Sequence, residues 1–399
     1  TIQNKDFDAV IPNYIDLDQY RKNGGYQIAE QVREGMIDND QIIKTLKESG
    51  LKGKGGAGFP TGMKWEIVSK YEGKKYVAVN GDEGEPGTFK DRSYLEKDPH
   101  RFLEGALIAS LFINASNVYI YMRDEYPAVI KILKDEILKL ENENIIPAGH
   151  FIIRRGAGAY ICGEESAMIE SIEGKRGLPR HRPPYVAEVG LFNSPTLTNN
   201  LETLFWIRDI IEKGSEWFAE KGVSGNKGFH SFSVSGRVRE PGVKVAPAGV
   251  TIQELIDDYC GGMKEDHIFK GYLPGGASGG ILPASMNNIP LDYGSKELTD
   301  AGCFLGSAAI VVLSDKDSMK DVALNLLKFF EEESCGQCTP CRVGTEKTVK
   351  LMKEKIWNKE KLADLSEVMS QASICGLGQA ATNPLNSVLK YFGNEISYE

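Results

Sequence analysis

Four cysteines constrain this chain more than any other feature of its sequence. Cys335, Cys338 and Cys341 are separated by two residues each, and Cys375 follows farther along the chain. A C-x₂-C-x₂-C run with a remote fourth cysteine is the ligand set expected for a [4Fe–4S] cluster. Structural zinc sites more often use two separated C-x₂-C pairs or mixed Cys and His ligands. The spacing therefore predicts an iron–sulfur protein, with zinc as the alternative.

Composition indicates a globular protein that works in a reducing compartment. The 399 residues predict two or three domains, and 41% of them are apolar, which is ample for real cores. With 47 basic and 56 acidic residues the net charge is −9, so nonspecific binding to nucleic acid or anionic membrane is not expected. The most apolar stretches, residues 103–122 and 304–313, are interrupted or too short to span a bilayer. We expect no targeting segment, no membrane insertion and a cytoplasmic location.

Three cysteines lie outside the cluster motif. Cys162, Cys260 and Cys303 have no metal-ligand spacing. A free cysteine usually behaves as a small hydrophobic residue. We therefore expect all three to be buried and without a chemical role.

Strands and helices alternate through the first half of the chain. Such alternation predicts an open parallel α/β sheet. Two helices, with Gly50 as a C-cap, form an expected N-terminal wrap. The expected strands cover residues 76–79, 117–122 and 151–153, and the expected helices cover 27–34, 39–48, 103–112, 126–140 and 166–172.

The second half of the chain predicts two further units. Residues 227–313 contain expected strands at 229–234 and 243–245, and Thr251-x-x-Glu254 is a capping box that opens a helix through Tyr259. This pattern indicates a small α+β domain. From Ser318 onward the pattern is helical, with expected helices at 319–332, 345–356, 361–372 and 384–392. Four helices imply a bundle that carries the cluster.

The first glycine-rich loop is a candidate phosphate cradle. Residues 53–58 read GKGGAG and satisfy G-x-G-x-x-G. The dinucleotide fingerprint requires a strand before this motif and a helix after it, whereas here a helix precedes the loop and Pro60 follows it closely. The Rossmann interpretation fails on that ground. Unhindered backbone N–H groups near Lys54 and Lys64 still suit an anion, and a plain tight turn is the alternative.

An acidic loop follows the expected strand at residues 76–79. It reads NGDEGEPG and carries Asn80, Asp82, Glu83 and Glu85 at the carboxyl edge of the sheet, where α/β proteins bind ligands. Carboxylates accept hydrogen bonds from sugar hydroxyls and repel phosphate, so this loop should face the sugar portions of a nucleotide. Binding of a hard metal ion and a solvated acidic turn are the alternatives.

A third loop joins the expected strand at 151–153 to the helix at 166–172. It reads GAGAYICGEE over residues 156–165, and a glycine turn at a helix start favours anions. Glu164 and Glu165 complicate phosphate binding and favour hydroxyl contacts. Lys175, Arg176, Arg180, His181 and Arg182 then form a basic stretch that ends beside Tyr185. This stretch is either a phosphate contact or ordinary surface charge.

Five ordered motifs resemble one family. They are GKGGAGFPTGMKW at residues 53–65, VNGDEGEPGTFKDR at 79–92, GAGAYICGEE at 156–165, TNNLET at 198–203 and the cysteine motif. Together they resemble the NADH-binding, FMN-containing flavoprotein subunit of respiratory complex I, the 51-kDa-type family shared with NAD-linked hydrogenases and formate dehydrogenases. The likeness covers nearly the whole chain. Ile67 and Arg182 depart from its pattern, standing where some relatives have an aromatic residue and a lysine.

The resemblance implies a fold of three classes, α/β plus α+β plus all-α. The expected domains are an N-terminal helical wrap at 1–50, an atypical Rossmann-like FMN- and NADH-binding domain at 51–224, a ubiquitin-like β-grasp domain at 225–315 and a four-helix [4Fe–4S] domain at 316–399.

The resemblance also implies roles for individual residues. FMN would be held by Gly53, Lys64, Asn80, Asp82, Glu83, Asn199 and Asn200, and NADH would contact Phe59, Glu85, Glu165 and Tyr185. The remaining expected cofactor-binding residues are Gly55, Gly56, Gly58, Tyr160, Gly163 and Glu164. Glu85, Glu165 and Lys64 would act in catalysis, and a carboxylate at Glu165 near the adenosine ribose would favour NAD over NADP. Arg342 beside Cys341 would raise the cluster potential.

The implied function is NADH oxidation within a larger enzyme. Hydride would pass from NADH to FMN, then single electrons to the cluster and on to partners, namely a thioredoxin-like [2Fe–2S] subunit and a larger multi-cluster iron–sulfur subunit. The enzyme would be of the complex I type, held at the inner face of the membrane through its partners. A diaphorase subunit of an electron-bifurcating hydrogenase or formate dehydrogenase is the alternative, disfavoured because no thioredoxin-like or ferredoxin-like extension is visible. A non-catalytic zinc and nucleotide-binding scaffold is the alternative of another class.

Overall fold

The computed structural model describes residues 10–398, which divide into two compact units. The first unit holds the described residues up to Gly84, Phe89–Gly177 and Arg182–Lys221. The second holds Glu85–Thr88, Leu178–His181 and the described residues from Gly222 onward. Two short segments from the first half of the chain therefore belong to the second unit.

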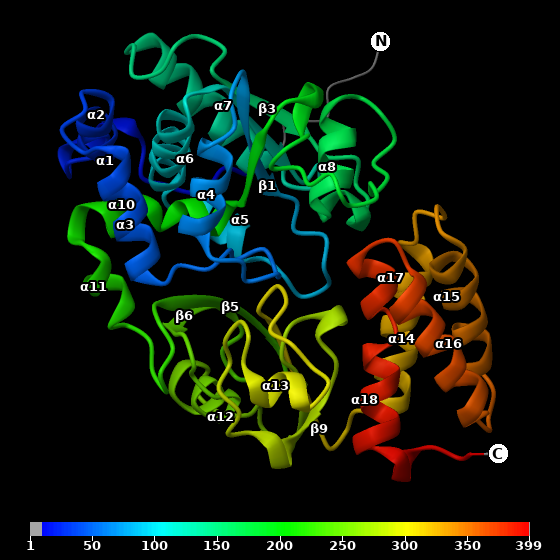
Figure 1. The fold of residues 1–399 in the computed structure, drawn as a ribbon. Coiled ribbons are helices and arrows are strands. Elements are labelled where there is room, and N and C mark those ends of the chain that lie inside the picture. Colours follow the sequence, from blue (N-terminus) through cyan, green and yellow to red (C-terminus); the bar gives the residue numbers. More distant parts are fainter. Residues whose placement is uncertain (1–9, 399) are drawn as a thin grey trace. The chain divides into compact units, whose positions relative to one another are not determined.

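The first unit is built on a four-stranded parallel sheet with the strand order β3-β2-β1-β4 (Figure 1). The strands are β1 (Lys75–Gly81), β2 (Ala115–Met122), β3 (Phe151–Arg155) and β4 (Thr196–Asn200). Val79 of β1 pairs with Ile120 of β2 and with Asn199 of β4. Val77 and Val79 are fully buried, as expected for a parallel sheet covered on both faces. The predicted parallel sheet is confirmed, although β4 was not foreseen.

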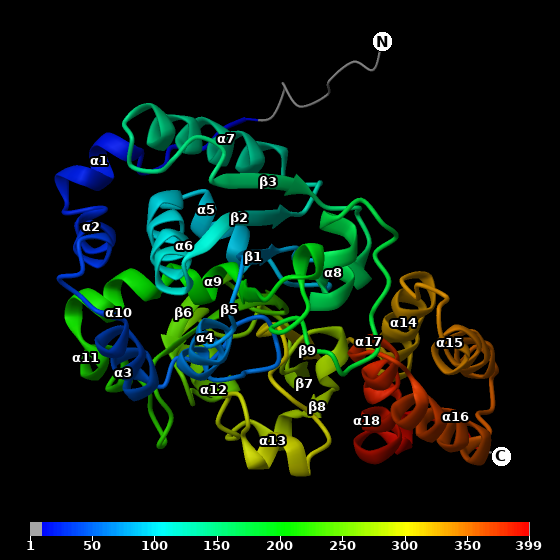
Figure 2. The same ribbon diagram turned by 45° about the horizontal axis from the view of Figure 1, so that its top comes forward.

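Helices surround this sheet. α6 is buried at nearly every position and packs on β1 and β2, and α8 packs on the same two strands. Figure 2 shows the arrowheads of β2 and β3 pointing toward the side where α8 lies. The helices of the first unit are α1 (Leu17–Lys22), α2 (Gln27–Arg33), α3 (Asn39–Ser49), α4 (Thr61–Ser69), α5 (Lys90–Leu95), α6 (Pro99–Ile113), α7 (Pro127–Asn142), α8 (Glu165–Ile172), α9 (Leu201–Phe205), α10 (Ile207–Lys213) and α11 (Ser215–Ala219).

The first glycine-rich loop runs from helix to helix. α3 ends at Gly50, whose φ of +70° confirms the predicted C-cap. Pro60 does not block a helix, because it is the N-cap of α4, which begins at Thr61. Proline is tolerated at a helix start, where its missing N–H would have no intrahelical acceptor. The loop therefore has the following helix that the dinucleotide fingerprint requires, and lacks the preceding strand.

The second unit contains a five-stranded mixed sheet with the order β6-β5-β9-β7-β8. The strands are β5 (Phe229–Gly236), β6 (Gly242–Pro247), β7 (Phe269–Leu273), β8 (Leu282–Pro283) and β9 (Ala309–Ser314). β5 and β9 are parallel, and the other neighbouring pairs are antiparallel. Its core gathers apolar side chains from three strands, including Phe232, Tyr272 and Ile310.

The predicted capping box of this sheet region is confirmed. The Thr251 hydroxyl accepts a hydrogen bond from the N–H of Glu254, and the Glu254 side chain accepts one from the N–H of Thr251. The helix α12 (Ile252–Glu254) continues as a π-turn through Tyr259. The other helix beside this sheet is α13 (Lys296–Asp300).

The chain from Met319 onward is helical, as predicted, but with different bounds. The helices are α14 (Met319–Glu332), α15 (Thr339–Met352), α16 (Lys359–Ala372), α17 (Gly376–Ala380) and α18 (Asn383–Tyr391). α15 starts six residues before the expected position because Pro340 lies in its first turn. α17 is a short helix that the sequence pattern did not reveal.

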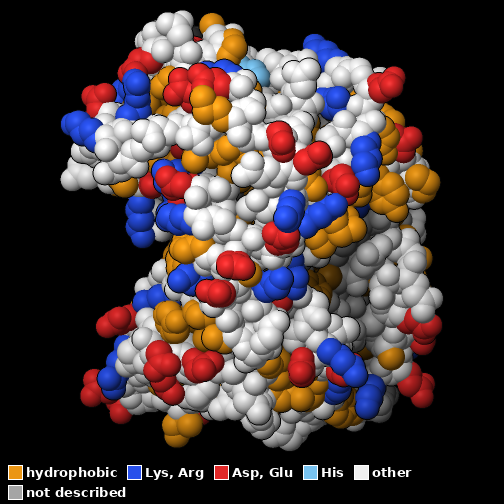
Figure 3. Space-filling model, turned by 60° about the vertical axis from the view of Figure 1, so that its left-hand side comes forward, with side chains coloured by type: hydrophobic (Ala, Val, Ile, Leu, Met, Phe, Trp, Pro, Cys, Tyr) orange, Lys and Arg blue, Asp and Glu red, His pale blue; other side chains and the backbone are white. Residues whose placement is uncertain are grey.

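No helix within residues 10–398 combines the length and the apolar composition needed to cross a bilayer. On the face seen in Figure 3, Lys and Arg side chains alternate with Asp and Glu side chains and do not gather into one basic area.

Candidate functional site

Two of the predicted loops meet at the carboxyl edge of the parallel sheet. Asn80, at the end of β1, donates a side-chain hydrogen bond of 2.8 Å to the carbonyl of Gly163, in the loop after β3. A methyl group on Gly84 would lie 3.1 Å from the Cα of Tyr160. Both positions therefore need close backbone approach. The acidic loop and the third loop form one surface, as their positions after parallel strands predicted.

The first glycine-rich loop joins the same edge of the first unit. The N–H of Lys54 donates to the hydroxyl of Thr203 at 2.9 Å. A methyl group on Gly55 would lie 3.2 Å from Cβ of Asn200, at the end of β4. Gly56 and Gly58 have φ values of +123° and +63°, which favour glycine. Three loops distant in sequence thus converge at one sheet edge.

Lys64 and Glu165 form the central charged pair of this edge. Lys64 Nζ lies 3.5 Å from Glu165 Oε2 and 3.2 Å from the carbonyl oxygen of Thr198. The Thr198 hydroxyl donates to the same Glu165 oxygen at 2.7 Å. Burial opposes ionisation of Glu165, but Lys64 and Thr198 outweigh it and hold the pKa of this carboxyl below its ordinary value. Glu165 is therefore a held anion at neutral pH.

Glu164 serves the start of α8. Its carboxylate accepts hydrogen bonds from the N–H groups of Ser166 and Ala167, at 2.9 and 3.0 Å, as an N-cap side chain does. Arg182 pairs with Glu164 and lies 3.6 Å from Glu165. The basic stretch of the sequence thus reaches this edge of the first unit through Arg182.

The two asparagines after β4 are held from inside the unit. Trp65 donates its indole N–H to Asn199 Oδ1 at 3.0 Å. Asn200 donates to Asp91 Oδ2 at 2.6 Å and accepts from Lys90 at 3.3 Å and from the N–H of Glu202 at 3.0 Å. These contacts fix the side-chain orientation of both amides.

A buried ion cluster supports Asn200. Lys90 Nζ lies 2.8 Å from Asp91 Oδ1 and 3.0 Å from Glu202 Oε2, and all three side chains are at most 2% exposed. Sequence analysis missed Lys90 and Asp91 as part of the site. The available signal was a run of three charges, Lys90 to Arg92, close behind a buried strand.

Glu83 is buried and engaged by backbone. Its carboxylate accepts hydrogen bonds from the N–H groups of Asp91 at 2.7 Å and Arg92 at 3.0 Å, at the start of α5. Burial, assisted by the nearby Asp91 carboxylate, raises the pKa of Glu83 to about 7. The side chain of Glu83 therefore holds α5 to the acidic loop.

Glu85 belongs to the second unit, where a glycine-rich loop at residues 274–280 receives it. The N–H and the hydroxyl of Ser278 donate to Glu85 Oε1 at 2.9 and 2.6 Å. A methyl group on Gly276 would lie 2.7 Å from the Glu85 carboxyl carbon. Burial raises the pKa of Glu85, and the Ser278 hydrogen bonds oppose that shift. Sequence analysis missed this loop, although four glycines in seven residues were a readable signal.

Two aromatic side chains of the first unit offer open ring surface. Phe59 is 42% exposed and Tyr185 is 57% exposed. Large exposed aromatic rings are favourable platforms for stacking. Both rings are thus able to take a planar ligand.

The cluster motif lies among the C-terminal helices of the second unit. Cys335 and Cys338 are half-buried before α15, Cys341 is buried in its first turns, and Cys375 is the N-cap of α17. The Ser334 hydroxyl lies 3.3 Å from Cys341 Sγ. Burial raises the pKa of the Cys341 thiol, and the Ser334 contact opposes that shift. Within residues 10–398, no three Cys, His, Asp or Glu side chains are packed tightly enough to hold a single metal ion.

The donor sets fit the two cofactors that the sequence predicted. Four cysteines suit an iron–sulfur cluster, and the buried hydroxyl of Ser373, two residues before Cys375, has no hydrogen-bond partner among the described residues. Glycine backbone, Lys64, Asn80 and the asparagines after β4 suit a flavin phosphate and its ribityl hydroxyls. Cys162, Cys260 and Cys303 are at most 3% exposed, which confirms the expected burial.

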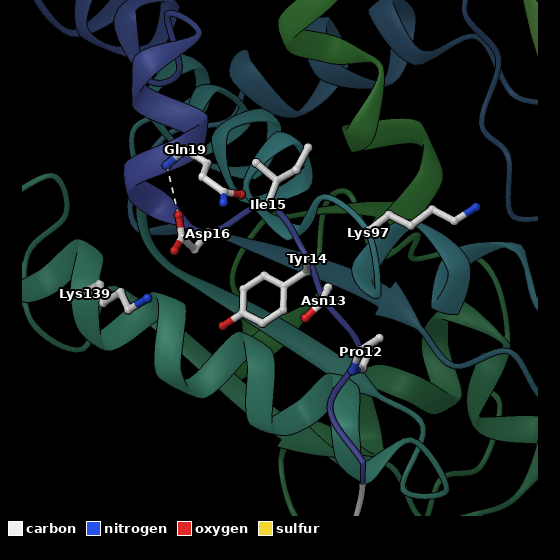
Figure 4. Close-up of a pocket in the computed structure, with 8 residues that line it drawn as sticks. All are labelled: Pro12, Asn13, Tyr14, Ile15, Asp16, Gln19, Lys97 and Lys139. Carbon is white, nitrogen blue, oxygen red and sulfur yellow. Dashed lines mark hydrogen bonds between the residues drawn. The ribbon is translucent and has the colours of Figure 1, made fainter.

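A separate cavity of about 610 Å³ lies elsewhere in the first unit (Figure 4). It is lined by Pro12, Asn13, Tyr14, Ile15, Asp16, Gln19, Lys97 and Lys139. None of the residues predicted to bind FMN, NADH or iron lines it. The candidate site is therefore the loop edge and not this cavity.

Family models match both parts of the site. Residues 46–209 match the Nuo51 FMN-binding domain, and residues 321–399 match the NADH-ubiquinone oxidoreductase-F iron–sulfur binding region. The first match spans the three loops, and the second spans the four cysteines. FMN and a [4Fe–4S] cluster are thus the cofactors of this chain.

Whole-length relatives agree. The second F subunit of the NADH-quinone oxidoreductase of Rhizobium meliloti strain 1021 is 40% identical over 97% of this chain and 94% of its own length. The corresponding F subunit of Aquifex aeolicus strain VF5 is 40% identical over 96% of this chain and 91% of its own length. In three dimensions the chain is similar to a chain of the NAD⁺-reducing [NiFe]-hydrogenase in the H₂-reduced state, with a TM-score of 0.85, 32% identity, and coverage of 97% of this chain and 68% of that one. The chain belongs to the family of NADH-quinone oxidoreductase F subunits.

Proposed function

We propose that this chain oxidises NADH and delivers the electrons to partner iron–sulfur subunits. One observation carries the proposal: a single chain contains both the loop edge matched to an FMN-binding domain and the four cysteines matched to an iron–sulfur region. NADH donates two electrons as a hydride, whereas a cluster takes one electron at a time. FMN, when bound, supplies the conversion between the two.

The loop edge of the first unit would hold FMN. Backbone N–H groups of the loop with Gly53, Gly55, Gly56 and Gly58 would bind the phosphate. Lys64, Asn80, Asp82, Glu83, Asn199 and Asn200 would hold the flavin and its ribityl chain. The internal contacts of Asn199 and Asn200 support this assignment, because a polar side chain held by its own protein binds a ligand without a large ordering cost.

NADH would contact aromatic and acidic side chains. Phe59 and Tyr185 would stack on its rings, and Tyr160, Gly163 and Glu164 would border its path. Glu165, held as an anion by Lys64 and Thr198, would accept hydrogen bonds from ribose hydroxyls and repel a 2′-phosphate. Glu85 would orient the nicotinamide end, and Lys64 would also stabilise negative charge on the reduced flavin.

The cysteine residues would ligate the cluster, with Cys335, Cys338, Cys341 and Cys375 as its four ligands. Arg342 would raise the reduction potential of the cluster by its positive charge. Arg342 donates to the carbonyl of Gly336 at 2.5 Å, between two of the cysteines, which supports that role.

The finer architecture follows the same family. We infer an N-terminal helical wrap at 1–50, an atypical Rossmann-like domain at 51–224, a ubiquitin-like β-grasp domain at 225–315 and a four-helix cluster domain at 316–399. The mixed sheet with parallel β5 and β9 supports the third domain, and the contacts among α14, α15, α16 and α18 support the fourth.

Iron–sulfur partner subunits are required, because one cluster provides no final acceptor. We infer a thioredoxin-like [2Fe–2S] subunit and a larger multi-cluster subunit, in a complex I-type enzyme at the cytoplasmic face of the membrane. The similarity to a chain of an NAD⁺-reducing hydrogenase favours a second candidate, the diaphorase of a hydrogenase. Nickel in a complex purified with this chain would identify the second candidate, and quinone reduction without nickel would identify the first.

Anaerobic absorption spectroscopy before and after NADH addition tests the proposal. The chain should carry one FMN and about four irons, and NADH should bleach both the flavin and the cluster absorption. NADPH at equal concentration is the matched control and should act far more slowly. A colourless chain that contains zinc and ignores NADH, after reconstitution with FMN, iron and sulfide, would replace the proposal with a nucleotide-binding scaffold.

A further inference from the structure

The hydroxyl of Ser373 is a buried donor without a partner. Ser373 is the C-cap of α16 and is only 5% exposed. Its N–H donates to the carbonyl of Met369 at 3.2 Å, and its own carbonyl accepts from the Gln379 side chain at 3.0 Å. The hydroxyl alone has no partner among the described residues. An unpaired buried hydroxyl costs about 1–3 kcal/mol, so its retention calls for a physical reason.

The position of this hydroxyl supplies the reason. A methyl group placed on Gly378 would lie 2.5 Å from Ser373 Oγ and 2.9 Å from Cys341 Cβ. The serine hydroxyl and the Cys341 side chain therefore border the same point, which only glycine leaves open. Ser334 contacts Cys341 as well, with its hydroxyl 3.3 Å from the sulfur. Hydroxyl groups from two segments thus lie around one cluster cysteine.

We propose that Ser373 donates a hydrogen bond to sulfur at the Cys341 corner of the [4Fe–4S] cluster and thereby raises the reduction potential of the cluster. This inference rests on the proposed function, because it requires the cluster. Reduction adds one electron and one negative charge, so a hydroxyl donor stabilises the reduced form more than the oxidised form. Hydrogen bonds to cluster sulfur are among the main determinants of cluster potential. Ser373 is a positioning residue in this sense, because it changes the potential and transfers nothing itself.

A redox titration of the full chain, followed by electron paramagnetic resonance, tests the inference. Ser373→Ala should lower the midpoint potential, with a change of about tenfold in the reduction equilibrium, or about 59 mV for one electron. Thr348→Val is the matched control. Thr348 is a fully buried residue of α15, and its hydroxyl donates to the Gly344 carbonyl at 2.7 Å. This variant should leave the potential unchanged.

A second readout does not depend on the variant being stable. After exchange into deuterated water, electron–nuclear double resonance of the reduced, unaltered chain should detect an exchangeable proton coupled to the cluster, and Ser373→Ala should lose that coupling. Absence of the coupling in the unaltered chain would overturn the inference. An unchanged potential in Ser373→Ala, with about four irons still bound, would overturn it as well. A chain that binds no iron would instead refute the proposed function.

Discussion

Ser278 donates two hydrogen bonds to one carboxylate oxygen of Glu85, one from its N–H at 2.9 Å and one from its hydroxyl at 2.6 Å. The close approach of Gly276 to the same carboxyl group leaves no room for a side chain there. Glu85 is therefore held in one orientation by a glycine-rich loop that lies far from it in sequence. Any role of Glu85 in binding NADH depends on this loop.

Ser278→Ala should raise KM for NADH about fivefold and change kcat much less. The variant keeps the backbone hydrogen bond and loses the hydroxyl, and a hydrogen bond of this kind contributes about 1 kcal/mol. Steady-state kinetics with an artificial electron acceptor provides the measurement. Ser295→Ala, which removes a helix-capping hydroxyl in the same unit, is the control. Equal KM values for the two variants would remove Glu85 from the NADH site.

Glu165→Gln should weaken the preference for NADH over NADPH by about tenfold, which corresponds to about 1.4 kcal/mol. Thr198 and Lys64 hold this side chain as an anion, and an anion repels the additional phosphate of NADPH. The ratio of kcat/KM for the two nucleotides is the quantity to compare. Glu188→Gln, at an exposed glutamate, serves as the control. A ratio that does not change would place the adenosine ribose elsewhere.

The regular part of this structure was readable from the sequence. Buried strands such as β1 and β2 consist of short apolar runs, and the loops after them carry the glycines and acids that mark a ligand edge. Residues 80 and 163 were predicted to share this edge, and the hydrogen bond of Asn80 to Gly163 confirms it. Local signals such as Gly50 and the Thr251 capping box were correct because they depend on few neighbours.

Other features depended on contacts that no local pattern contains. Lys90 looks like an ordinary surface charge in sequence, because lysine is rarely buried unless it is paired. Its partner Glu202 lies after a strand that the sequence did not reveal. The place of Glu85 in the second unit likewise depends on Ser278. Which residues contact FMN, NADH and iron stays a prediction.

Lys90→Met should destabilise the first unit by about 3–5 kcal/mol, the usual cost of leaving buried charges without their partner. Asp91 and Glu202 would remain buried without Lys90. Urea unfolding of the FMN-free chain, followed by tryptophan fluorescence, should show an earlier transition. Lys131→Met breaks an exposed pair with Asp135 and should cost less than about 0.5 kcal/mol. Similar unfolding curves for both variants would contradict the buried cluster.

Glu83 should make the first unit less stable as pH rises from about 4.5 to about 7. Its pKa is raised in the folded chain, from 4.5 to about 7, so the folded state binds the proton more tightly than the unfolded state. The contribution of Glu83 to stability is then complete below pH 4.5 and is lost as pH rises through 7.

Urea unfolding at several pH values, compared between the unaltered chain and Glu83→Gln, isolates this contribution. The difference in stability between the two proteins should shift in favour of the variant as pH rises through that window, because glutamine carries no charge. Glu188→Gln should show no such trend. A difference that is constant between pH 4.5 and 7 would mean that Glu83 titrates normally in the folded chain.

Cys375→Ala should remove the cluster and leave FMN in place. The cluster would lose one of its four thiolate ligands, whereas the FMN-binding match ends at residue 209, far from Cys375 in sequence. Iron analysis should fall well below about four per chain, and released flavin should remain near one per chain. Cys260→Ala, at a fully buried cysteine in the core of the mixed sheet, should keep both cofactors. If Cys375→Ala retained its iron and its visible spectrum, the fourth ligand would have to be another residue.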